Sequence, residues 1–175
     1  MGQAPTKPPS WVEAFIEAEL RSAGKSIKEM RSTTNESKKP VTQFLDAYKA
    51  AIFAKDVGAF VALYDQDVCV FDMWGTWSYS SVGAWREMAT EWFGSLGTER
   101  VEVSFDDVRT TSARDVVVAY AFVTYKGLSA EGEALRAMKN RLTVVLGQKG
   151  ATWKIVHEHS SAPVDFETLK VILGR

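Results

Sequence analysis

The stretch WKIVHEHSSAP, residues 153–163, holds the only two histidines of the chain at the end of an apolar alternation. Alternating side chains of a β-strand point to opposite faces of a sheet. One face would carry Trp153, Ile155, His157 and His159, and the other would carry Lys154, Val156 and Glu158. The alternation therefore predicts a closing strand whose two histidines share a face, with Glu158 pointing away from them.

Three roles are open to these histidines: a metal site, an acid–base pair, or the polar end of a buried strand. Residues two apart on a strand have Cα atoms roughly 6.6–7 Å apart, so two imidazoles could share one ion. A metal site also needs a third ligand. Because Glu158 would face away, only Asp72 or an unplaced carboxylate could serve. The favoured interpretation is that His157 and His159 are structural or line a pocket, and no metal is predicted.

The segments before this strand change period once, from helical to alternating. Apolar residues recur at helical spacing up to Leu96 and alternate after Gly97. Helices are predicted over residues 41–56, 57–64 and 82–96, a short strand over 67–72, and four longer strands over 99–108, 115–126, 140–146 and 151–160. Helices grouped ahead of an antiparallel meander predict an α+β fold whose bent sheet curls around them.

The start of the chain differs in composition from the rest. Residues 1–40 are predicted to hold a disordered start, an appended helix at about 10–30 and a polar linker that ends at Pro40. The main domain is predicted over residues 41–165, and residues 166–175 would form a C-terminal tail.

Composition narrows the class of protein. A formal net charge of −1 and a sequence pI near 6.2 give no basic field for nucleic acid. The single cysteine, Cys69, excludes an internal disulfide and a multi-cysteine zinc site. No apolar run reaches the roughly 18 residues of a membrane span, and the N-terminus lacks the apolar core of a signal peptide. A cytoplasmic protein is expected, and lipidation of Gly2, which fits a short myristoylation pattern, is left open.

The chain also resembles a known superfamily. The run from Leu45 to Ser80, followed by four strands that end in WKIVHEHSSAP, is similar to the SnoaL-like superfamily, also called nuclear transport factor 2-like. The resemblance covers roughly residues 41–165 and implies a cone, in which a bent antiparallel sheet wraps three helices and leaves a pocket at its open end. The closing strand is similar to that of the association domain of calcium/calmodulin-dependent kinase II and of related stand-alone bacterial domains.

Asp72 is the first candidate for chemistry. Alternation within DVCVFD places Asp72 on the face of Val68 and Val70, so its carboxyl points either to solvent at a rim or into a cavity. In a cavity, desolvation would raise its pKa toward that of a general base.

Ketosteroid isomerases of the same superfamily suggest a partner for Asp72. Their oxyanion-hole tyrosine lies eight residues before an acidic residue, a spacing that Tyr48 and Asp56 reproduce, and their catalytic aspartate matches Asp72. The resemblance thus implies that Asp72 removes a proton alpha to a carbonyl while Tyr48 stabilises the enolate.

This chain departs from those isomerases at their second, protonated aspartate. The matching stretch MKNRLTVV offers Asn140 or Arg141 instead. An arginine there would bind an anion through its planar fork, so Arg141 is expected to anchor an acidic ligand such as a carboxylate.

Four further aromatic residues complete the expected pocket. Trp74 and Trp77 flank a glycine directly after Asp72, where a pocket mouth would lie, and Tyr64 and Tyr120 could reach the cavity. His157 and His159 would be secondary pocket residues. No motif implies a cofactor.

Two functions follow from these features. The first is binding of a small, enolisable or acidic molecule, with isomerase, dehydratase or cyclase chemistry by Asp72 and Tyr48; whether catalysis occurs is left open. The second is non-catalytic assembly into a homodimer or a higher oligomer through the outer face of the sheet.

Overall fold

The computed structural model describes residues 27–174, together with residues 14 and 18. The chain divides into two compact units, residues 1–38 and residues 39–175. The described elements are α2 (Ile27–Ala54), α3 (Val57–Val61), β1 (Tyr64–Phe71), α4 (Val82–Ser95), β2 (Arg100–Ala113), β3 (Val116–Leu128), β4 (Ala134–Lys149) and β5 (Thr152–Ser161). This order of helices, one early strand and four later strands is the α+β fold that the sequence predicts.

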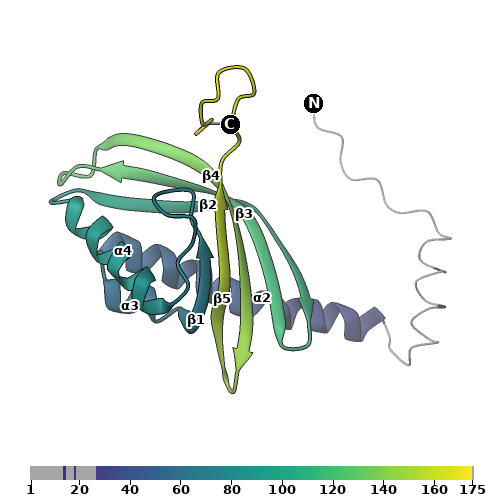
Figure 1. Ribbon diagram of the computed structural model, residues 1–175. Coiled ribbons are helices and arrows are strands. Elements are labelled where there is room, and N and C mark those ends of the chain that lie inside the picture. Colours follow the sequence, from purple (N-terminus) through teal and green to yellow (C-terminus); the bar gives the residue numbers. More distant parts are fainter. Residues whose placement is uncertain (1–13, 15–17, 19–26, 175) are drawn as a thin grey trace. The chain divides into compact units, whose positions relative to one another are not determined.

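The five strands form one curved sheet in the order β1-β5-β4-β3-β2 (Figure 1). Strands β2 to β5 pair as an antiparallel meander, whereas β1 runs parallel to β5 at the sheet edge. The parallel edge pair brings the end of β1 beside the end of β5, and Phe71 is opposite His159. Two segments that are almost ninety residues apart in the chain therefore meet at one place.

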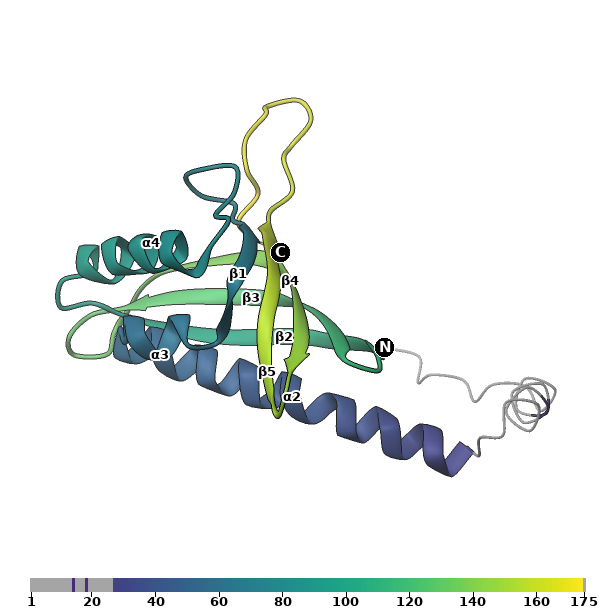
Figure 2. The ribbon, with the colours of Figure 1, turned by 60° about the horizontal axis from the view of Figure 1, so that its bottom comes forward.

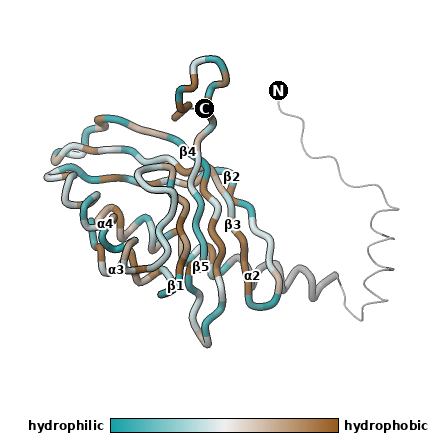
Figure 3. The backbone as a smooth tube through the Cα atoms, in the orientation of Figure 1, coloured by the Kyte–Doolittle hydropathy of each residue, from teal (hydrophilic) through white to brown (hydrophobic). Residues whose placement is uncertain are grey.

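The helices supply one side of the hydrophobic core. Figure 2 shows α3 and α4 beside the same face of the sheet, which is called the inner face below. Phe60 of α3 is fully buried, and its ring lies 5.3–6.0 Å from those of Tyr48, Tyr64, Trp85 and Phe93. Such edge and tilted contacts are favourable for aromatic rings. Figure 3 shows hydrophobic residues recurring along the strands, with hydrophilic residues at the β4–β5 turn.

A short turn between α2 and α3 fixes their relative direction. Lys55 adopts a positive φ of 55°, and Asp56 caps α3 by accepting a hydrogen bond from the Ala59 amide at 2.9 Å. The helix α3 ends at Val61, whereas the sequence predicted a helix up to residue 64.

Residues 31–40 are helical, although a linker was expected there. They belong to α2, and Pro40 lies inside that helix. An interior proline removes one backbone hydrogen bond and crowds the preceding turn, which usually kinks or breaks a helix, yet α2 continues past Pro40. The expected disordered start, Gly2 and most of the expected helix at 10–30 lie outside the described residues.

The last residues fold back on the domain. Val164 and Val171 form an isolated antiparallel bridge, and the Lys139 amide donates to the Leu173 carbonyl at 2.8 Å. Leu173 is thereby held beside β4.

One irregularity in β5 reverses the expected facing of its polar residues. The register runs from Leu146 opposite Ile155 to Val145 opposite His157, so Val156 is an extra residue, a β-bulge. Ile155 and Glu158 are both buried on the inner face, although an unbroken alternation would separate them.

Gly147 of β4 accommodates this bulge. A Cβ atom at Gly147 would lie only 3.0 Å from Cγ1 of Val156. The missing side chain therefore leaves the space that the Val156 side chain occupies.

Candidate functional site

A cavity of about 730 Å³ lies between the helices and the inner face of the sheet. This volume is typical of small-molecule sites. Its walls are mostly apolar and aromatic, and carboxyl, hydroxyl and amide groups interrupt them. The lining residues include Tyr48, Phe60, Asp72, Trp74, Tyr79, Trp85, Glu91, Trp92, Tyr125, Arg136, Asn140 and Glu158.

Asp72 follows β1 and lines the cavity, beside the inward-facing Val68 and Val70. Its Oδ1 accepts a hydrogen bond from Ser160 Oγ at 2.5 Å, and Ser160 Oγ in turn accepts one from the Met73 amide at 2.8 Å. Burial raises the pKa of the Asp72 carboxyl, and the hydrogen bond from Ser160 partly offsets that rise. A half-buried carboxylate of raised pKa is suited to accept a proton.

Two tyrosine hydroxyls from different elements meet in the same cavity. Tyr48 of α2 and Tyr125 of β3 lie 2.8 Å apart, oxygen to oxygen. Burial raises the pKa of both phenols, so both keep their protons at neutral pH. One proton serves the bond between them, which leaves the other hydroxyl proton able to reach a ligand. Tyr48 thus shares the cavity with Asp72, but as one member of a pair that the sequence did not reveal.

Glu158 is the cavity residue that sequence reasoning placed on the wrong face. It is 3% exposed, and its Oε2 accepts a hydrogen bond from the Tyr64 hydroxyl at 2.8 Å. The pKa of the carboxyl is raised to about 8, because the rise from burial and the smaller rise from the charge of Asp72 outweigh the lowering by the Tyr64 hydrogen bond. Tyr64, expected as a pocket residue, is buried and supports Glu158. The bulge at Val156 breaks the alternation, and Gly147 in the neighbouring strand was its only signal.

The histidines lie on the outer face of the sheet, so the expectation that they line the pocket is corrected. A ring nitrogen of His157 (Nδ1) is 2.8 Å from the Cys69 carbonyl oxygen. The Phe71 ring packs edge-on against both imidazoles, with centroids 5.0 Å from His157 and 5.9 Å from His159. Among the residues that the structure describes, no three histidine, cysteine, aspartate or glutamate side chains are placed to hold a metal ion.

Arg141 and Tyr120 also lie away from the cavity. On β4, Asn140 and Leu142 are buried on the inner face, and alternation turns Arg141 outward, where it is exposed. Tyr120 is 45% exposed and likewise absent from the cavity wall. The expected anion anchor is therefore replaced by Asn140, a neutral side chain whose Nδ2 donates to Met73 Sδ at 3.0 Å.

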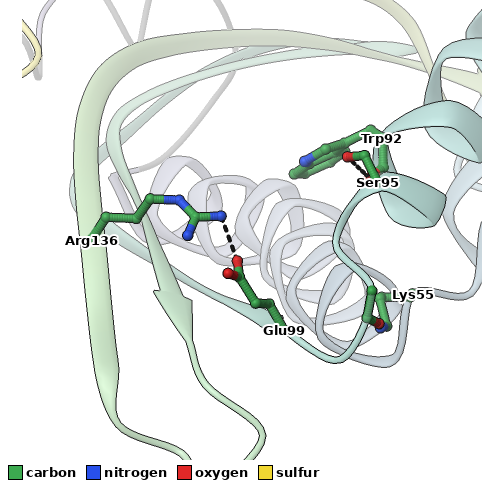
Figure 4. A network of polar contacts seen from close by, with 6 residues as sticks. Lys55, Trp92, Ser95, Glu99 and Arg136 are labelled. Carbon is green, nitrogen blue, oxygen red and sulfur yellow. Dashed lines mark hydrogen bonds and ion pairs between the residues drawn. The ribbon is translucent and has the colours of Figure 1, made fainter.

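The mouth of the cavity has one aromatic residue and one ion pair at its edge. Trp74 lines the mouth, whereas Trp77 is 97% exposed and does not. Arg136 reaches from β4 to Glu99, with Nη2 and Oε2 2.5 Å apart (Figure 4), and Trp92 of α4 lines the same cavity. Among the described residues that line the cavity, Arg136 is the only lysine, arginine or histidine, and Glu99 already pairs with it.

None of the described helices combines the length and the apolar character that crossing a bilayer requires.

Comparisons with known proteins agree with this architecture. An NTF2-like protein of unknown function from Pseudomonas putida KT2440 is 23% identical, with a TM-score of 0.68 over 81% of this chain and 95% of that one. A putative calcium/calmodulin-dependent protein kinase II association domain from Xanthomonas campestris is 18% identical, with a TM-score of 0.61 over 70% of this chain and 85% of that one. An NTF2-like superfamily protein from Salmonella enterica is 17% identical, with a TM-score of 0.62 over 77% and 96% of the two chains.

The search of curated proteins found no match. The family model of the SnoaL-like domain matches residues 41–165, which include every strand and the whole cavity-forming sheet. The chain therefore belongs to the SnoaL-like domain family.

Proposed function

We propose that this protein binds a small enolisable carbonyl compound in its cavity and transfers a proton at the carbon next to the carbonyl. The observation that carries the proposal is that Asp72 and the Tyr48–Tyr125 hydroxyl pair line the same largely apolar cavity. The SnoaL-like family often binds small molecules, which supports the binding step.

The proton transfer assigns one role to each group. The Asp72 carboxylate would take the α-proton, and the electron pair of the C–H bond would move onto the carbonyl oxygen. Tyr48 or Tyr125 would donate a hydrogen bond to that enolate oxygen, an interaction that contributes roughly a few kcal/mol in enzymes of this type. The protonated Asp72 would then return the proton to the same carbon or to a conjugated one, which restores the carboxylate.

Proton exchange tests the proposal without knowledge of the product. We expect the protein to accelerate exchange of the α-protons of cyclic ketones and enones with D₂O, followed by NMR. Asp72→Asn should slow this exchange about 10²- to 10⁴-fold, the usual contribution of a general base. Asp67→Asn is the matched control, because Asp67 is exposed on the same strand. Equal rates for the wild type and Asp72→Asn would overturn the proposal.

We propose self-assembly through the outer face of the sheet as a second candidate function. Phe71 and Tyr120 are 43% and 45% exposed on that face, and apolar side chains of this size favour burial against a partner. A similar solved structure is described as a putative association domain.

Light scattering tests assembly directly. A dimer or larger oligomer is expected at micromolar concentration, and Phe71→Asp should dissociate it. Phe166→Asp is the control, since Phe166 is 93% exposed outside the sheet. A monomeric wild type would exclude this function.

A further inference from the structure

The cavity contains more acidic than basic groups. Asp72 and Glu158 line its interior and Glu91 its mouth, whereas the one basic lining residue, Arg136, is paired with Glu99 outside the lining. In an apolar cavity such an imbalance acts on a ligand more strongly than in water, because charges are less screened there. This excess of acidic groups favours a cationic ligand, which stabilises the ionised form of a carboxyl, over the carboxylate that the sequence suggested.

Asp72 and Glu158 lie close enough to act on one ligand group. Val70 is opposite Glu158 in the parallel β1–β5 pair, so Asp72 is two positions further along the neighbouring strand on the same inner face. The Cα atoms of diagonal neighbours are about 7–8 Å apart, within reach of long side chains. A ligand whose ammonium group pairs with Glu158 through its N–H donors would therefore lie beside Asp72.

Hydroxyl groups donate hydrogen bonds to both carboxyls, but no basic side chain among the described lining residues pairs with either of them. Ser160 donates to Asp72, and Tyr64 donates to Glu158 through Oε2 only. Tyr48, Tyr125 and Tyr64 face Glu158 as neutral phenols, and Asp72 faces it as a like charge. No lysine, arginine or histidine among the described lining residues compensates Glu158 from within the cavity. A carboxylate buried without a partner of opposite charge is costly, so Glu158 favours its protonated form until a cationic ligand supplies that partner.

The aromatic walls suit the same kind of ligand. Trp74, Trp85 and Trp92 line the cavity together with Tyr79 and Phe60. The faces of aromatic rings attract cations, and tryptophan attracts them most strongly. Carboxyls in a wall of aromatic rings are the combination that recognises an organic ammonium ion.

We propose that the cavity takes an organic cation, an aromatic amine whose ammonium group pairs with Glu158. The inference rests on the proposed ligand-binding role of the cavity and names the class of ligand. The carbonyl compound of the proposed reaction would then carry a basic nitrogen, with Glu158 as its anchor and Asp72 free to move the proton.

A series of three ligands of equal shape and different charge tests this inference. Calorimetry would measure the affinities of 1-naphthylmethylamine, 1-naphthylmethanol and 1-naphthoate. The amine should bind about tenfold or more tightly than the alcohol, as a charge-assisted hydrogen bond predicts, and the naphthoate most weakly. Glu158→Gln should remove the preference for the amine and leave the affinity for the alcohol within about twofold.

Proton release provides a readout that a merely structural Glu158 would not give. At pH 7 much of Glu158 is protonated in the free protein, because its pKa is about 8. Amine binding should therefore release up to about one proton per ligand, seen as a dependence of the binding heat on the ionisation heat of the buffer. The release should be absent in Glu158→Gln and retained in Glu87→Gln, whose carboxyl is exposed outside the cavity lining.

The outcomes separate this inference from the proposed function. An alcohol that binds as tightly as the amine, or a preference that persists in Glu158→Gln, would overturn the inference alone if α-proton exchange still depends on Asp72. Failure of all three naphthalenes to bind would also overturn it. Loss of the Asp72 dependence, with the amine preference intact, would overturn the proton transfer and keep the cation site.

Discussion

The two faces of β5 carry polar residues one position apart, yet they have opposite environments. On the inner face Glu158 and Ser160 are 3% and 6% exposed and belong to the cavity site. On the outer face His157 and His159 pack against Phe71 and do not reach the cavity. One extra residue, Val156, decides which set faces inward. The residue types of β5 alone therefore did not reveal which of its polar residues face the cavity.

The largest expected effect is on the free energy of unfolding, and it should differ between a buried and an outer-face position of β5. Ile155 is fully buried, so Ile155→Ala should lower the free energy of unfolding by about 2–5 kcal/mol. His159→Ala should change it by only about 0.5 kcal/mol, because His159 is exposed. Urea denaturation of both variants checks the contrast. Similar losses in the two variants would break the distinction between the faces.

The pH dependence of stability should come from the inner face. Below about pH 4.5 Glu158 is protonated in both the folded and the unfolded chain, so it does not change the free energy of unfolding. Between that pH and about 8 the Glu158 carboxyl is ionised in the unfolded chain but protonated in the folded one. The free energy of unfolding therefore falls as pH rises, by about a few kcal/mol in total. Glu158→Gln should flatten this slope in denaturation curves at several pH values.

Asp72 contributes in the same direction, because burial raises its pKa too, so some slope should remain in Glu158→Gln. Glu102→Gln is the control, since Glu102 is exposed on β2. An unchanged slope in Glu158→Gln would show that Glu158 is ionised in the folded protein at neutral pH.

A smaller effect should report on the bulge itself. A Cβ at Gly147 would lie 3.0 Å from the Val156 side chain, so Gly147→Ala should destabilise the fold by about 1–2 kcal/mol. Shortening the neighbour in the double variant Gly147→Ala, Val156→Ala should recover part of the loss. Gly94→Ala is the matched control, because a Cβ there meets nothing within 4 Å and alanine favours a helix. Thermal unfolding of the four proteins would measure these differences.

The smallest effect is expected on the rate of α-proton exchange when residues of the outer face are replaced. Replacing His157 and His159 together by alanine should leave α-proton exchange within about twofold of the wild type, since neither side chain lines the cavity. A loss comparable to that of Asp72→Asn would place the histidines in the reaction and contradict the separation of the two faces.

Local patterns predicted much of the fold and part of the site. The change from helical to alternating period after Gly97 predicted the order of elements, because each period depends only on neighbouring residues. Alternation within β1 is regular from Val68 onward, and it placed Asp72 on the face that lines the cavity. The linker prediction failed at residues 31–40, because a polar composition with a proline does not exclude a helix.

The sequence by itself determined the α+β order and the family, since these depend on periodicity and on motifs along the chain. The resemblance to ketosteroid isomerases singled out Tyr48 and Asp72, and both line the cavity. Only the tertiary structure decided that Glu158 faces the cavity and that Arg141 does not. The physical reason is that a strand's facing is set by its register with its neighbours. The pairing of β4 with β5 accommodates one extra residue at Val156, and no pattern within β5 alone reveals that shift.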